Sequence, residues 1–343
     1  MDIRRSLLMA NSITEEEEGN ILTLKYDINS TSSETQIIST TPGTGTTVQG
    51  VTYVQWDLNQ LDAMYIDDVE YTPKYTHKFT STGIHTIKLV FNDTFNTMGM
   101  MFTGCNRLKE VDFTNTDLSN VTIMGGVWGD CTSLTSINFA NVDTSNVTTM
   151  MGLVDSCTAL ETIDLSMFNT SKVTDFAYMF HGCTSLTSID LSNFDTTSLT
   201  DMYQMFTDCS NLKTANLSSF NTSKVIDFSR LFKNCSKLES VDMRNIGSTN
   251  ITTTANYGEI FYGCLNLKTI YWGMKTAPTV YNTTFGNSKS TYTGYNTRSN
   301  SVNKLYLPTG HSGYTTAGSI WNKRYWKDVL QNTSYCGFTI ATY

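Results

Sequence analysis

The sequence predicts an α/β solenoid, a stack of similar coils that each combine a strand, a turn and a short helix. Six cysteines recur at one constant interval of about 26 residues, and a seventh follows after a slightly longer interval. Apolar residues keep fixed distances from each cysteine: Phe, Trp or Val stands three residues before it, and Leu three residues after it. A unit of this length cannot bury its apolar face alone, so the period indicates stacked repeats.

Each coil is expected to contain three elements. The segment Leu186–Leu191 alternates apolar and polar residues, as a half-buried strand does. Residues 192–198 are rich in Asn, Asp, Thr and Ser, which favour a turn. Residues Val173–Phe180 offer Thr174 or Asp175 as an N-cap, with apolar spacing for about one helical turn. We therefore expect a parallel strand ladder and one short helix per coil.

The residue pattern of two adjacent coils resembles that of a known repeat family. The pattern MF-x-x-C-x-x-L-x-x-I-D-L-S-x-F-x-T-S-x-V-T-D is nearly complete at residues 179–201 and again at 205–227, and it resembles the BspA-like leucine-rich repeat over about residues 102–272. The resemblance implies a parallel, right-handed solenoid of the kind found on bacterial and protist surface proteins and in virion proteins of phages of gut bacteria. Such proteins typically bind rather than catalyse. One departure is Thr116, which stands in the first coil where later coils have Phe.

Composition divides the chain into four parts. Residues 1–19 form an expected docking arm, 20–95 a small all-β, sandwich-like module, 96–275 a solenoid of about seven coils, and 276–343 an aromatic-rich C-terminal cap. Runs of β-forming residues support the module, and its last run is expected to fold as a hairpin at Ser81–Gly83. A terminal helix is expected at about residues 313–330 within the cap, which resembles the closing segment of BspA-like arrays.

The cysteine column is expected to consist of buried thiols. Stacked coils place equivalent residues roughly 5 Å apart, but their side chains point along parallel vectors, whereas a disulfide needs converging ones. Free cysteine packs as a small hydrophobe. No C-x-x-C or Cys–His cluster indicates zinc, so neither a metal nor a cofactor is expected. The members of the column are Cys105, Cys131, Cys157, Cys183, Cys209, Cys235 and Cys264.

Charge and motifs exclude several classes of function. Charged residues make up 16% of the chain and the net charge is −8, which disfavours a nucleic-acid partner. No apolar run of about 20 residues predicts membrane insertion, and the run Ser6–Ala10 is too short for a signal peptide. Hydrolase, phosphate-binding and metalloprotease motifs are missing, and His181 occupies a variable position of the repeat. A non-enzymatic protein is therefore expected.

Two places are candidates for ligand binding. A column of polar residues on the strands could bond a polysaccharide or hold cations; alternatively, its members are solvated strand residues whose mixture of Asp and Asn limits repulsion. The C-terminal tip offers aromatic rings to a sugar or a protein, or else simply covers the end of the stack. The candidate residues are Asp164, Asp190, Asn216 and Asp242 in the column, and Trp272, Trp321 and Trp326 at the tip.

These features predict a virion structural protein that is made in the host cytoplasm and serves as a fibre, decoration or host-attachment component. The opening RRSLLMAN resembles that of structural proteins of tailed phages of gut bacteria, and its residues Ile3, Arg4, Arg5, Leu7 and Leu8 are expected to dock onto other virion proteins. The repeats or the tip would contact a host surface glycan or protein, and a homo-oligomer stays open. The alternative is a bacterial cell-surface adhesin of the same repeat family.

Overall fold

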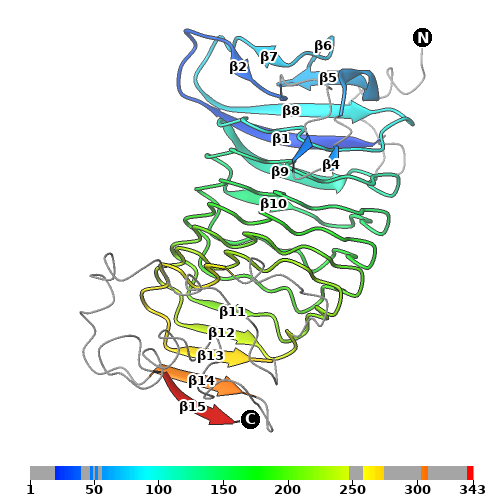
Figure 1. The fold of residues 1–343 in the computed structure, drawn as a ribbon. Helices are drawn as coiled ribbons and strands as arrows, with labels where there is room; N and C mark the ends of the chain where they lie inside the picture. The colour runs from blue at the N-terminus through cyan, green and yellow to red at the C-terminus, as the bar shows by residue number, and fades with distance from the viewer. Residues whose placement is uncertain are drawn as a thin grey trace.

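The computed structural model describes residues 20–39, 47–48, 51–52, 56–246, 258–273, 303–307 and 338–342. Within these ranges the protein is mostly β, with one 3-10 helix at Leu58–Gln60 and no α-helix. Coils of similar course stack on one another through the middle of the molecule, with β1 and β8 beyond one end of the stack and β14 and β15 beyond the other (Figure 1). Tandem repeats are therefore confirmed.

A six-stranded sheet joins the N-terminal segment to the first coils. Its order is β10-β9-β1-β8-β5-β6. The strands are β1 (Ile21–Ile28), β5 (Leu61–Ile66), β6 (Val69–Tyr71), β8 (Gly83–Phe91), β9 (Leu108–Asn115) and β10 (Ser136–Asn138). The repeat strands β9 and β10 are parallel, whereas β1 is antiparallel to both β8 and β9. Because β1 pairs with the outer edge of β9, it covers the edge that the first repeat would otherwise expose.

Contacts outside the sheet also hold the N-terminal segment on the first coil. The hydroxyl of Thr116 is buried and donates to the carbonyl oxygen of Ile21 at 2.8 Å. The amide nitrogen of Gln36 donates to the carbonyl oxygen of Thr103 at 2.8 Å. The departure from Phe at position 116 is thus explained, because a hydroxyl there satisfies a carbonyl group of β1. Where one domain ends and the next begins stays a prediction.

Two short sheets complete the N-terminal segment. In one, β2 (Thr35–Gln36) pairs with β7 (Thr76–His77), and in the other, β3 (Thr47–Val48) pairs with β4 (Val51–Thr52), both antiparallel. The hairpin expected at Ser81–Gly83 is wrong: β7 pairs with β2, whereas the following strand β8 pairs with β1 and β5. The turn therefore connects two different sheets.

The strand ladder of the repeats is formed only in part. The second large sheet is fully parallel and has the order β11-β12-β13-β14-β15, with β11 (Thr214–Asn216), β12 (Ser240–Met243), β13 (Thr269–Trp272), β14 (Asn303–Leu307) and β15 (Phe338–Thr342). Between β10 and β11, two coils contribute no strand, so the strand expected at Leu186–Leu191 is not part of a sheet. Contacts elsewhere in the coil hold these two repeats in the stack.

The expected short helix is replaced by a series of turns. In the coil at 173–183, the N–H groups of Met179, His181 and Cys183 donate to carbonyl groups three residues earlier. The alternate N–H groups, those of residues 176, 178, 180 and 182, donate instead to the next coil, for example from Tyr178 to the carbonyl of Tyr203 at 2.9 Å. An α-helix that begins at Thr174 or Asp175 would need the N–H groups of residues 180 and 182 for bonds to carbonyl groups four residues earlier. Because the N–H groups of residues 180 and 182 instead donate to carbonyl groups of the next coil, the helix cannot form.

Left-handed residues recur at two positions of every coil. Five residues before the cysteine stand Met100, Gly126, Gly152, Tyr178, Gln204, Arg230 and Glu259, and directly before it stand Gly104, Asp130, Ser156, Gly182, Asp208, Asn234 and Gly263, all with φ between 55° and 78°. Gly, Asn and Asp adopt this conformation at least cost, which suits the composition of the second position. These residues interrupt any helical run, which is the second reason why the α/β class is wrong for the described residues.

The main core is one cluster of buried side chains that extends from Leu22 to Trp272. The apolar column three residues before the cysteines is buried in every coil. Its rings stack nearly parallel, with centroids 5.3 Å apart for Phe180 and Phe206 and 5.2 Å apart for Phe206 and Phe232. Each coil therefore buries its apolar face against its neighbours, as the repeat period predicts.

Candidate functional site

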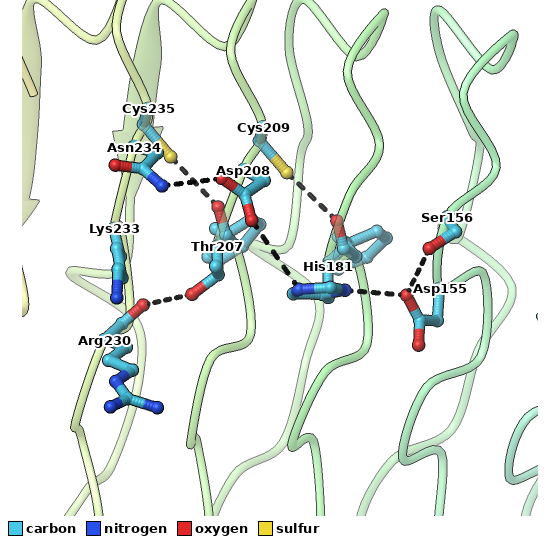
Figure 2. A network of polar contacts seen from close by, with 12 residues as sticks. Asp155, Ser156, His181, Thr207, Asp208, Cys209, Arg230, Lys233, Asn234 and Cys235 are labelled. Carbon is cyan, nitrogen blue, oxygen red and sulfur yellow. Dashed lines mark hydrogen bonds and ion pairs between the residues drawn. The ribbon is translucent and has the colours of Figure 1, made fainter. Parts of the chain in front are cut away.

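The seven cysteines of the column are buried and free. From the second onward, each thiol donates to a backbone carbonyl group of the preceding coil at 2.9 to 3.1 Å, and Figure 2 shows two of these bonds, at Cys209 and Cys235. Burial raises the pKa of every thiol in the column, that of Cys105 to about 12. Neutral thiols are poor nucleophiles and poor metal ligands. The column is thus a packing and hydrogen-bonding element.

The polar column on the strands lies at the surface and closes turns. Asp164, Asp190 and Asn216 are exposed, and each accepts a bond from the backbone N–H two residues later at 2.9 to 3.0 Å. These bonds lower the pKa of Asp164 and Asp190. Asp242 is partly buried, and its carboxylate pairs with Arg244. Their local bonds support the interpretation as solvated strand residues, although a bound ligand stays a prediction.

Of the candidate residues in the aromatic tip and the docking arm, only Trp272 lies within the described ranges. Trp272 is 2% exposed and packs edge to face on Phe261, with ring centroids 6.5 Å apart. Its ring belongs to the core, which does not suit the exposed platform that was predicted. Trp321 and Trp326 lie outside the described residues, as do the arm residues Ile3, Arg4, Arg5, Leu7 and Leu8.

A more varied surface lies in the turns just before the cysteines. Here partly exposed aromatic and charged side chains from consecutive coils form what we call the lateral face, and Figure 2 shows some of its charged members. Its members are Asp155, Tyr178, His181, Tyr203, Asp208, Arg230, Lys233, Glu259 and Tyr262. Beside it, a small apolar cluster separate from the main core contains Met151 and Ala177. The rings of Tyr178 and Tyr203 meet edge to face across two coils, 5.2 Å apart.

His181 lies at the centre of the lateral face, between carboxylates of the two neighbouring coils. Its Nδ1 is 2.8 Å from Asp155 Oδ1 and its Nε2 is 3.7 Å from Asp208 Oδ2. The hydrogen bond to Asp155 and the charges of Asp155, Asp208 and Asp130 raise the pKa of His181, against the opposing effect of burial. The imidazole ring is 27% exposed, so it faces both the protein and the solvent.

The basic residues of the lateral face are held by one acid. Glu259 Oε2 lies 3.0 Å from Arg230 Nε and 2.7 Å from Lys233 Nζ. Arg230 also donates to the hydroxyl of Tyr203 at 2.9 Å, and Lys233 lies over the ring of Tyr262. Burial acts to raise the pKa of Glu259, but the two cations lower it overall. Both cations are thus oriented while remaining partly exposed to solvent.

Below the lateral face, three aspartates occupy equivalent positions of consecutive coils. Asp175, Asp201 and Asp227 are joined by parallel backbone bridges, and each carboxylate accepts a bond from the N–H two residues later. Burial raises the pKa of Asp175. Burial, together with the charges of Asp175 and Asp227, raises the pKa of Asp201 to about 7, although the bond from Tyr203 opposes this shift.

One contact in the N-terminal segment resembles the order of groups in a serine hydrolase. His85 Nδ1 lies 2.6 Å from Asp67 Oδ2, and its Nε2 lies 3.4 Å from the hydroxyl of Ser81. The same Nε2 lies closer, at 3.0 Å, to the carbonyl oxygen of Ser81. A carbonyl oxygen only accepts, and it is the closer of the two partners, so this contact differs from a Ser–His pair in which the base nitrogen faces the hydroxyl. The contact ties two turns together.

The residues that the structure describes contain neither a metal centre nor a membrane-spanning helix. Among the described residues, no group of three or more His, Cys, Asp or Glu side chains could hold a metal ion. The described part of the chain also contains no helix with the length and apolar character needed to cross a bilayer. The lateral face combines aromatic, acidic, basic and imidazole side chains from consecutive coils, and it is therefore our candidate site.

Comparison with protein families agrees with this repeat architecture. A family model described as "Mycoplasma protein of unknown function, DUF285" matches twice in tandem, at residues 96–190 and 186–294. Together the matches cover more than half of the chain. The chain belongs to the DUF285 family. The match supports the BspA-like type of the repeat, and no curated protein and no solved structure matches significantly.

The lateral face was not singled out as a site from the sequence of the DUF285 repeats. One signal was available: two residues before the cysteines, where the apolar columns are uniform, the chain varies as Thr103, Gly129, Asp155, His181, Thr207, Lys233 and Tyr262. Variation at one position of an otherwise regular repeat indicates a surface that packing does not constrain. The sequence alone could not show that His181 meets Asp155 and Asp208, because these contacts depend on how adjacent coils align.

Proposed function

We propose that this member of the DUF285 family is a non-enzymatic recognition protein whose repeats form a BspA-like leucine-rich solenoid with a parallel strand ladder. The solenoid is a stiff scaffold, and the lateral face is its binding surface. We place the protein in a phage virion, as a fibre, decoration or host-attachment component. It uses no cofactor, and its partner is a host surface glycan or protein.

The observation that supports recognition is the arrangement of Tyr178, Tyr203, Arg230 and Lys233. The two tyrosines and the two cations come from consecutive coils, whose backbones are joined by hydrogen bonds of 2.7 to 3.4 Å. Tyr and Arg are the residue types that contribute most to protein interfaces, because they combine apolar area with directed bonds. A rigid backbone reduces the entropy lost on binding.

The virion assignment rests on the opening of the chain rather than on the repeats. Residues 1–19, with Ile3, Arg4, Arg5, Leu7 and Leu8, would dock onto other virion proteins and orient the stack outward. Removal of residues 1–19 should abolish incorporation into particles while the repeats stay folded. Normal incorporation of the truncated chain would contradict the docking role. A bacterial cell-surface adhesin is the alternative, and it would use the same lateral face.

Two experiments test these assignments. Immunogold electron microscopy, with an antibody against the repeats, should label phage particles; labelling of uninfected cells would favour the adhesin. Binding of the purified full-length chain to cells of the source culture is then compared for Y203A/K233A and for the control S188A/T214A on the exposed strand surface. We expect the first variant alone to lose binding. Equal binding of both variants would exclude the lateral face.

A further inference from the structure

His181 links coils through both of its ring nitrogens. One nitrogen faces Asp155 of the preceding coil and the other faces Asp208 of the following coil (Figure 2). Only the imidazolium ion carries a proton on both nitrogens, so only the charged ring can donate to Asp155 at 2.8 Å and also attract Asp208 as an ion pair at 3.7 Å. The chain of contacts continues outward, because Ser156 donates to Asp155 at 2.9 Å and Asn234 donates to Asp208 at 2.8 Å. Four consecutive coils thus meet through one titratable group.

Asp201 is a second titratable group between the same coils. Its nearest charged neighbours along the stack are Asp175 and Asp227, and both repel the ionised form. The nearby cations Arg230 and Lys233 are paired with Glu259 instead. Protonation of Asp201 removes a charge from the middle of three aligned carboxylates and leaves its bond from the backbone N–H of Tyr203 possible.

The two groups affect stability in the same direction. The pKa of His181 is raised above 6.5, so its contribution is complete below that value and is lost as the pH rises through the folded-state pKa. The pKa of Asp201 rises from an ordinary value of 3.8 to about 7 in the folded state, so the cost of its charge is absent in acid and grows until about neutral pH. Both effects therefore destabilise the stack as the pH increases.

We propose that the coils from Asp155 to Asn234 form a proton-responsive lock, in which uptake of protons at His181 and Asp201 tightens coil stacking as the pH falls through neutrality. This property goes beyond the proposed function and needs no partner. It makes the rigidity of the lateral face depend on the pH of its surroundings.

Thermal unfolding of the full chain at about pH 5.5, 7 and 8.5 tests the lock. The midpoint of the wild type should fall by several degrees from the lowest to the highest pH. H181Q and D201N should each have a shallower slope than the wild type, and the double variant should have the shallowest slope of the three variants. The control is H77Q, because burial lowers the pKa of His77 and this histidine lies outside the lock, so its removal should keep the downward slope.

A titration by NMR tests the same idea without relying on a stable variant. The His181 ring signal should titrate above the ordinary histidine value in the wild type, and D155N should shift its midpoint down by about one pH unit. A double variant H181Q/D201N that keeps the wild-type slope would overturn the proposal. So would a His181 signal that titrates at or below the ordinary value.

Discussion

The thiol of Cys183 donates a hydrogen bond of 3.1 Å to the carbonyl oxygen of Val154 in the preceding coil. Cysteine is therefore more than a small apolar residue here, since Ala in its place would leave that buried carbonyl without this donor. C183A should lower the free energy of unfolding by about 1–2 kcal/mol, through lost packing and the lost bond. Urea denaturation measures the change, with S185A at a partly exposed neighbour as the control. Equal stability of the two variants would contradict the bonding role.

The cysteine column should also be chemically silent in the folded protein. All seven thiols are buried, and their pKa values are raised. In a C336S background, which removes the one cysteine outside the column, a thiol-reactive chromophore at about pH 8 should label none of them until denaturant is added. Rapid labelling under native conditions would show that the coils open far more readily than their packing implies.

A buried threonine column provides a second set of bonds between coils. Thr196 is 2% exposed, donates to the carbonyl oxygen of Asn221 at 3.3 Å, and accepts from the N–H of the same residue at 2.7 Å. T196V keeps the shape but removes both bonds, so it should destabilise the protein by about 1–3 kcal/mol. T196S keeps the hydroxyl and should lose less. The control T162V changes an exposed position where a β-branched residue is tolerated.

Alanine substitutions at two glycines distinguish the effect of backbone strain on stability from the effect of reduced flexibility in the unfolded chain. Gly182 has φ +68°, and an added Cβ would lie 3.1 Å from the hydroxyl oxygen of Ser156, whereas Gly129 has no such φ and its added Cβ would make only ordinary contacts. G182A should therefore cost about 1–2 kcal/mol of unfolding free energy. G129A should be neutral or slightly stabilising. Calorimetry of both variants decides the matter, and equal effects would rule out strain at Gly182.

Two elements predicted from local sequence patterns are absent from the described structure for a clear physical reason. Residues Val173–Phe180 carry the apolar spacing and the N-cap of a short helix, but the next coil accepts half of their N–H groups, as at Tyr178. The strand expected at Leu186–Leu191 has the right alternation, yet its neighbours do not form a ladder with it. In both cases local pattern is a weak guide, because hydrogen bonds between coils compete with those within a segment.

The contacts within the lateral face could not be predicted from local sequence either. His181, Asp155 and Asp208 come from three successive coils, far apart in sequence, and each is an ordinary surface residue when considered alone. Their contact arises because the backbone bonds align consecutive coils in register. The same register brings Asp201 between Asp175 and Asp227, which raises its pKa.

By itself the sequence determined the repeat period, the buried columns of Cys, Leu and Phe, and membership in a tandem-repeat class. These features follow from the sequence because apolar residues that are buried in every coil recur at a constant spacing along the chain. Only the tertiary structure decided that turns replace helices, that β1 pairs with the first repeat, and that His181 meets two carboxylates. Those outcomes depend on which backbone and side-chain groups of distant segments come within bonding distance, and a one-dimensional pattern does not contain that information.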